Sequence, residues 1–128
     1  MNDTRGFLTL NEYQDLAGAT NKGTKIYVKR SEYHPSDDVS SFVEVPGGYN
    51  AYGLAGEAGE YLEKVKKFAR DGTFDRVASA KELGDVLWYI SQNARDLGYT
   101  LEEIAQMNLA KLKDRKERGV LKGSGDNR

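Results

Sequence analysis

The sequence predicts an all-α domain of about four helices, and three observations support this prediction. Apolar residues recur at helical spacings in four segments, near residues 10–19, 49–70, 75–97 and 100–118. The first and last of these segments begin with a capping box, in which a threonine precedes a glutamate by three residues. Glycines suited to helix C-termini follow the three longer segments, at Gly72, Gly98 and Gly119. A chain of 128 residues suits one domain, which we assign to residues 1–118.

The first helix is expected from about Leu10 to about Ala19, after the Thr9 capping box. Residues 24–48 are harder to interpret, because Ile26 and Val28 alternate with polar neighbours as in a short strand or an extended loop. A long loop in a small domain is unusual unless it is functional or disordered, and we interpret this one as a functional flap. The polar, glycine-rich residues 119–128 predict a flexible tail.

Each of the three longer helices carries an apolar stripe that predicts a buried face. The stripe of the second helix contains Leu54, Ala55, Ala58, Tyr61, Leu62, Val65 and Phe68. That of the third contains Leu83, Val86, Leu87, Ile90, Ala94 and Leu97, and that of the fourth Leu101, Ile104, Ala105, Leu109 and Leu112. These stripes favour a helical bundle.

Composition excludes several kinds of site and partner. A net charge of −1 argues against a protein that grips a nucleic-acid polymer, since such domains are strongly basic. No apolar run is long enough to cross a membrane. The chain has no cysteine and one histidine, His34, so a metal site would consist mostly of oxygen ligands, which suits Mg²⁺ or Mn²⁺. The lack of cysteine also fits a reducing compartment, and we expect a cytoplasmic protein.

Two short acidic phrases stand out in the second and third helices. Glu57 and Glu60 form one pair, and Glu82 and Asp85 form the other. Carboxylates three residues apart lie on one face of a helix, where like charges destabilise it. A divalent cation would remove this conflict, because Mg²⁺ binds carboxylate oxygens. Alternatively, the acids of each pair are ordinary solvated residues on a helix surface. Both pairs border an apolar stripe, however, which favours a metal site shared by two helices.

Glycines and basic residues accompany the acidic phrases. Gly53, Gly56 and Gly59 lie at three-residue spacing within the second helix, although each costs about 1 kcal/mol against alanine. Their presence predicts a close approach by another helix or a ligand. Lys64 and Lys67 follow the first acidic pair by two helical turns, and either bind phosphates or form a solvated face.

The residues Gly53–Glu60, followed by Lys66-Lys67 and then Glu82–Tyr89, resemble the MazG-like nucleoside triphosphate pyrophosphohydrolases of the all-α NTP pyrophosphatase group. That family has an E-x-x-E pair, a spacer and an E-x-x-D pair, and the spacer here is residues 61–81. The resemblance implies a four-to-five-helix bundle that assembles as a homodimer or homotetramer. It also implies Mg²⁺-dependent cleavage of a nucleoside triphosphate between the α and β phosphates.

The resemblance also implies roles for individual residues. Glu57, Glu60, Glu82 and Asp85 would be the metal ligands, with Glu57 or Glu60 also the candidate general base. Asn108, Lys111 and Arg115 match an N-x-x-K-x-x-x-R segment whose basic residues meet phosphates. Tyr89 occupies a place where some relatives contact the nucleoside, and Tyr49 and Tyr52 either line a base pocket or pack. One departure is Gly56, where many relatives carry a further acid.

Two alternatives remain open at this point. A phosphoribosyl-ATP pyrophosphohydrolase uses a similar fold and metal motif. A non-catalytic helical interaction module with an acidic groove would need no turnover at all. The sequence does not reveal the preferred base or sugar.

Overall fold

The computed structural model describes residue 6 and residues 8–29 and 42–122. It contains four α-helices, α1 (Leu10–Ala17), α2 (Tyr49–Asp71), α3 (Arg76–Asp96) and α4 (Leu101–Glu117), with a 3₁₀ turn at Gly18–Thr20. The all-α class is therefore confirmed. The predicted flap centre, including His34, and residues 123–128 of the predicted tail lie outside the described residues.

Local sequence signals explain where the helices begin and end. Thr9 accepts a hydrogen bond from the Glu12 amide at 3.1 Å, and the Glu12 carboxylate accepts one from the Thr9 amide at 2.7 Å. Thr100 and Glu103 form the same reciprocal box at α4. Asp75 caps α3 by accepting a hydrogen bond from the amide of Ala78 at 2.9 Å. Both predicted capping boxes are confirmed.

A two-stranded antiparallel sheet occupies part of the segment that was ambiguous in the sequence. Strand β1 (Tyr27–Lys29) pairs with β2 (Phe42–Glu44), and Val28 lies opposite Val43. Gly48 follows at a positive φ of 49°, and a Cβ there would overlap the backbone of Thr24. Glycine is thus required where β2 turns into α2. The side chain of Phe42 on β2 is exposed.

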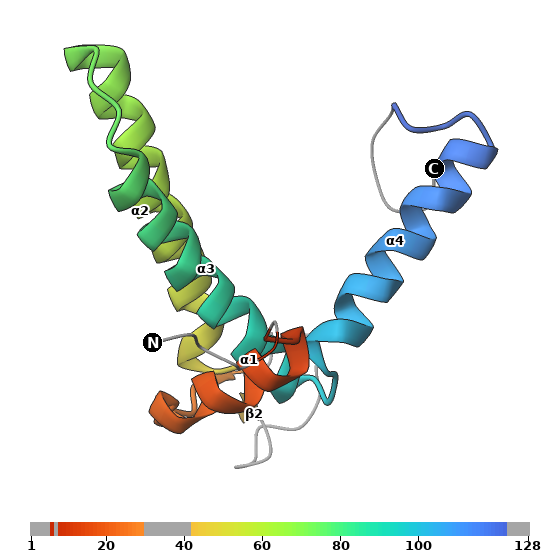
Figure 1. Cartoon of the computed structure of the whole chain (residues 1–128). Coiled ribbons are helices and arrows are strands. Elements are labelled where there is room, and N and C mark those ends of the chain that lie inside the picture. Colours follow the sequence, from red (N-terminus) through yellow and green to blue (C-terminus); the bar gives the residue numbers. More distant parts are fainter. Residues whose placement is uncertain (1–5, 7, 30–41, 123–128) are drawn as a thin grey trace.

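The helices form an open, V-shaped arrangement. Helices α2 and α3 run antiparallel as a long hairpin, and α4 leaves the base of that hairpin as a separate arm (Figure 1). Helix α1 lies at the base, where it contacts both α3 and α4. One chain therefore supplies the four predicted helices but not a closed bundle.

The base of the V holds a buried polar junction, which we define as Gln14, Ser91 and Gln92. The Gln14 side-chain amide donates to the carbonyls of Ser91 at 2.9 Å and Tyr99 at 3.1 Å. Its oxygen accepts from the backbone amide of Leu101 at 3.0 Å. Gln14 thereby joins α1 to the end of α3 and the start of α4. A buried amide with every partner satisfied fixes one geometry, because any displacement leaves polar groups unpaired.

Apolar side chains on the outer halves of the helices remain exposed. Among the described residues, the only buried hydrophobic ones are Ala94 and Leu101. The side chains of Leu62 on α2, Val77 on α3 and Leu109 on α4 are 63%, 67% and 65% exposed. Such long uncovered stripes are unusual for a monomer of this size. The stripes that we expected to be buried have the predicted positions but lack a cover within one chain.

Candidate functional site

Three acidic side chains from α2 and α3 converge in the hairpin. Glu57 comes from α2, and Glu82 and Asp85 come from adjacent turns of α3. One carboxylate oxygen of each lies within 4.8 Å of those of the other two, and we call these three residues the carboxylate trio. The antiparallel hairpin creates this proximity, since it sets the first half of α2 against the middle of α3.

The electrostatics of the trio favour a cation. Partial burial, and then the neighbouring charges of Asp85, Glu82 and Glu60, raise the pKa of Glu57 above its usual value. The ammonium of Lys64 lies 3.2 Å from a carboxylate oxygen of Glu82 and offsets only part of this charge. Three hard oxygen donors without histidine or cysteine suit Mg²⁺ or Mn²⁺, which would complete its coordination with water or phosphate. The residues present therefore fit a divalent metal.

Glu60 differs from the other three predicted ligands. It lies outside the carboxylate trio and is exposed, although its charge contributes to the raised pKa of Glu57. Its position one helical turn beyond Glu57 keeps it near the trio. The ligand role of all four acids remains a prediction, and the geometry groups Glu57, Glu82 and Asp85 most closely.

A cavity of about 280 Å³ is lined by two members of the trio, Glu57 and Asp85, together with Trp88 and Tyr89. Burial is the main cause that raises the pKa of Tyr89, with Tyr49 and the two carboxylates adding to it. A Cβ at Gly53 would overlap the Tyr89 ring, so this glycine lets the ring lie directly on α2. The predicted close approach is thus explained at Gly53 by a neighbouring helix.

Gly56 and Gly59 have no such explanation within one chain. A Cβ at either position would meet nothing within 4 Å among the described residues. Both glycines lie on exposed surface of α2. The close approach predicted for these two positions remains a prediction.

Trp88 contributes more than sequence reasoning assigned to it. Its ring meets that of Tyr89 edge to face, with centroids 4.9 Å apart. Its indole N–H also donates to the Ala17 carbonyl at 3.2 Å and the Thr20 hydroxyl at 3.0 Å. These bonds connect α3 to the end of α1 and hold the ring at the cavity wall.

Tyr13 was missed by the sequence analysis. Its pKa is raised by burial and then by the charge of Asp85, which places its phenol in the electrostatic field of the trio. It lies on α1 within the predicted apolar stripe of that helix, where a tyrosine gives no signal beyond packing. Only the packing of α1 onto α3 reveals this proximity.

Two further cavities continue from the first. The second, of about 260 Å³, shares Trp88 and Tyr89 with it and is also lined by Asn21, Tyr49 and Asn50. Tyr52 is not among the residues lining it, and its side chain is exposed. The carboxylate trio therefore adjoins an aromatic and amide-lined space.

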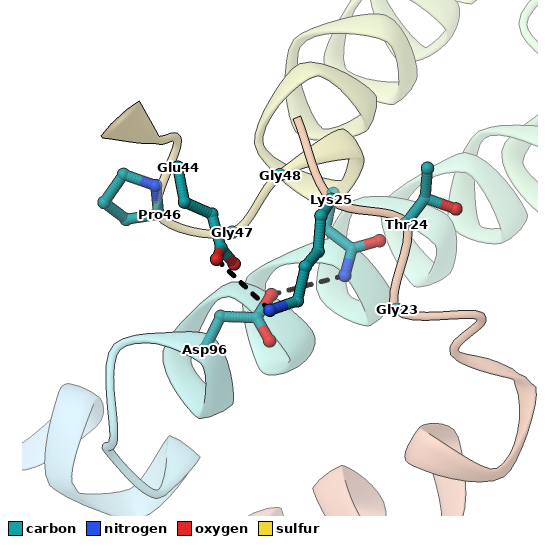
Figure 2. Close-up of a pocket in the computed structure, with 9 residues that line it drawn as sticks. Gly23, Thr24, Lys25, Glu44, Pro46, Gly47, Gly48 and Asp96 are labelled. Carbon is teal, nitrogen blue, oxygen red and sulfur yellow. Dashed lines mark hydrogen bonds and ion pairs between the residues drawn. The ribbon is translucent and has the colours of Figure 1, made fainter. Parts of the chain in front are cut away.

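The third cavity, of about 430 Å³, shares Gly23, Thr24 and Asn50 with the second. Figure 2 shows residues of its wall, which include the ion pair of Lys25 with Glu44 at 3.2 Å and the side chain of Asp96. The Asn50 side chain donates to the Asp96 carboxylate at 3.4 Å across this wall. Asn50 thus lines both the second and the third cavity.

The predicted basic residues lie in different places. Lys64 adjoins the trio through Glu82, and Lys67 lies one turn further along α2 on exposed surface. Asn108, Lys111 and Arg115 belong to α4, which points away from the hairpin (Figure 1). A single chain therefore does not bring this row alongside the trio.

Sequence comparisons agree with this geometry. The profile of the MazG nucleotide pyrophosphohydrolase domain matches residues 49–120, a stretch that includes α2, α3 and α4. The chain belongs to the MazG nucleotide pyrophosphohydrolase family. The Gene 37 protein of Mycobacterium phage L5 is 51% identical over 62% of this chain and 75% of the phage protein. No solved structure shows a significant match to the chain. Among the described helices, none is long and apolar enough to cross a membrane.

Proposed function

We propose that this MazG-family chain hydrolyses nucleoside triphosphates between the α and β phosphates, releasing a nucleoside monophosphate and pyrophosphate. The observation that carries this proposal is the carboxylate trio between α2 and α3, within the matched region and beside a cavity. A biological role in removing unwanted nucleotides or controlling their pool follows from that reaction.

Glu57, Glu82 and Asp85 would hold Mg²⁺, with Mn²⁺ as a substitute. When bound, such an ion polarises phosphate oxygens and lowers the pKa of a coordinated water. The proton of the attacking water then needs an acceptor close to the trio. Glu57 belongs to the trio itself, and Glu60 lies one helical turn away without belonging to it. These two glutamates remain the candidates for general base.

Basic side chains would stabilise the charge that develops on the departing pyrophosphate. Lys64 already lies beside Glu82, and Lys67 continues the same face of α2. We assign the second set of phosphate-binding residues to Asn108, Lys111 and Arg115 of α4, of which Lys111 and Arg115 are basic. Tyr89 would contact the nucleoside, since it lines both the cavity at the trio and the adjoining one.

The proposal includes a homodimer or homotetramer. The uncovered apolar side chains of α2, α3 and α4 support it, because burial of such surface yields about 25 cal/mol per Å². Open space above Gly56 and Gly59 would let another helix approach α2 closely. In such an assembly, α4 of one copy would bring Asn108 and Lys111 to the trio of another copy, whereas Arg115 is only 6% exposed within its own chain. Helix α4 would then both contact another copy and supply residues to the active site of that copy.

The test is an assay with each common NTP and dNTP in the presence of Mg²⁺, with separate detection of pyrophosphate and phosphate. Pyrophosphate release that stops with a chelator and returns with Mg²⁺ is the expected result. Release of single phosphate would contradict cleavage between the α and β phosphates. Phosphoribosyl-ATP belongs in the same panel, because preferential turnover of it would favour that alternative. No turnover of any compound would favour a non-catalytic helical module.

A complementation assay tests the role of α4 between copies. Asp85→Asn and Lys111→Ala chains would each be inactive as pure oligomers. If Lys111 acts on the trio of another copy, a mixture refolded together should regain part of the activity, since some sites combine two intact contributions. A mixture as inactive as its components would show that both residues act within one chain.

A further inference from the structure

The second cavity contains a chain of side-chain amides whose orientations are fixed by backbone groups. The amide nitrogen of Gln92 donates to the Gln14 carbonyl at 3.3 Å, so its oxygen must face the other way. That oxygen accepts a hydrogen bond from the Asn21 amide nitrogen at 3.1 Å. The Asn21 oxygen in turn accepts from the backbone amide of Gly23 at 3.0 Å. If the side-chain amide of Gln92 or Asn21 were rotated by 180°, its nitrogen would face another donor and its oxygen would face another acceptor.

The same chain fixes the orientation of Asn50. Its amide nitrogen donates to the Asn21 oxygen at 3.3 Å and to the Asp96 carboxylate at 3.4 Å. Both partners offer only acceptor atoms, so the two N–H groups of Asn50 are used and the nitrogen must lie on this side. The Asn50 oxygen is left over, and no described residue donates to it. Asn50 is 8% exposed and lines the cavity, and its oxygen is not among the buried unpartnered atoms, so we take this oxygen as an acceptor that a ligand in the cavity can reach.

An accessible acceptor that is fixed in one orientation favours a ligand that supplies a donor to it. The cavity lies next to the trio through Trp88 and Tyr89, and Tyr49 adds a third aromatic ring. Flat rings of this kind stack on nucleobases. A nucleotide with its phosphates at the trio would therefore place its base in the second cavity, with an edge directed to Asn50.

The amide chain also determines what kind of edge fits. An exocyclic amino group, such as N4 of cytosine or N6 of adenine, presents N–H donors, and the Asn50 oxygen can accept from one of them. Uracil and hypoxanthine carry a carbonyl oxygen at the same position, and that acceptor would oppose the Asn50 oxygen. The N–H groups of Asn50 are already used, and Asp96 adds negative charge behind them. A carbonyl placed opposite Asn50 would meet no free N–H of that side chain.

We infer that the second cavity selects nucleotides whose base carries an amino group at the cytosine N4 or adenine N6 position, with the Asn50 oxygen as the acceptor. This inference rests on the proposed function, because it uses the trio as the phosphate site. It makes Asn50 a specificity-determining residue, with Asn21, Gln92 and Asp96 as the residues that orient it.

The first experiment uses the unmodified protein and two matched substrate pairs, CTP with UTP and ATP with ITP. Within a pair the decisive difference is an amino group against a carbonyl. We expect kcat/KM for pyrophosphate release to be about tenfold higher or more for the amino member of the pair that fits the cavity. A CTP analogue with hydrogen in place of the amino group should lose a similar factor.

The second experiment replaces the acceptor. Asn50→Leu should bring the amino-to-carbonyl ratio of kcat/KM close to one, and a general loss of structure would not change that ratio. Asn11→Leu is the matched control, because Asn11 also forms two side-chain hydrogen bonds, with Glu102 on the far side of α1, and should keep the ratio. If Asn50→Leu does not fold, the analogue comparison with the unmodified protein decides the question.

The outcomes separate the two proposals. Pyrophosphate release with equal kcat/KM within both pairs, or a preference for the carbonyl member, would overturn the role of Asn50 and leave the proposed function intact. No pyrophosphate from any nucleotide would overturn both.

Discussion

The base of the V buries polar side chains, whereas its arms leave apolar side chains exposed. At the base, Gln14, Ser91 and Gln92 are buried and fully hydrogen-bonded within one chain. On the arms, Leu62, Val77 and Leu109 are largely exposed, although they occupy apolar stripes. Polar groups need directed partners, and one chain supplies them; apolar groups need only cover, which another copy can supply. The carboxylate trio lies in the hairpin above the polar junction.

The largest expected effect is loss of activity on removing a trio carboxylate. Asp85→Asn keeps the size of the side chain but removes a charge, so Mg²⁺-dependent turnover should fall by about 1000-fold, or about 4 kcal/mol. Helix content by circular dichroism should stay unchanged, since Asp85 forms no hydrogen bond in the described part of the chain. Near-normal turnover would remove Asp85 from the ligand set. The matched change Glu102→Gln, far from the trio on α4, should have little effect.

The next largest effect should come from the polar junction. Gln14→Leu leaves the Leu101 amide and the carbonyls of Ser91 and Tyr99 without their partner. Each buried group left unpaired costs about 1–3 kcal/mol, so the free energy of unfolding should drop by about 3 kcal/mol or more. Denaturant titration measures this drop. A change below about 0.5 kcal/mol would show that the junction is solvated and that the comparison between base and arms fails.

The arms should respond in assembly state. Leu109→Lys changes a side chain that is 65% exposed, so a monomer would tolerate it within about 0.5 kcal/mol. In an oligomer the same charge would be buried, and the protein should dissociate. Light scattering after size exclusion measures the mass. Gln106→Lys, at an exposed polar position of α4, is the control and should leave the mass unchanged. Equal masses for all three proteins would contradict an interface at Leu109.

The smallest expected effect is the pH dependence that Glu57 gives to the metal-free protein. Its pKa is raised in the folded state, so the folded protein binds the proton more tightly than the unfolded chain does. The contribution of Glu57 is therefore most favourable below the unfolded pKa and is lost as pH rises through the folded pKa. Thermal melts from about pH 4 upward should show this fall in the wild type and a smaller one in Glu57→Gln. Identical profiles would contradict the raised pKa.

Helix positions could be predicted because their signals are local. The capping boxes at Thr9 and Thr100 and the glycine stops at Gly72 and Gly98 act over four or five residues, and all are confirmed. The pairing of Glu57 with Glu82 and Asp85 was also accessible, since both acidic phrases border apolar stripes. Asn21, Asn50 and Tyr13 were not, because their neighbours are distant in the chain.

The sequence by itself determined the all-α class, the four helices and the two pairs of acids that border the apolar stripes of α2 and α3. Periodicity, caps and residue chemistry are properties of short segments, and they persist whatever the helices pack against. Tertiary structure alone decided that α4 leaves the hairpin, that Glu60 lies outside the trio and that Asn50 presents an acceptor. Those features depend on where distant segments meet, and the hydrogen-bond partners that fix them have no fixed spacing along the chain.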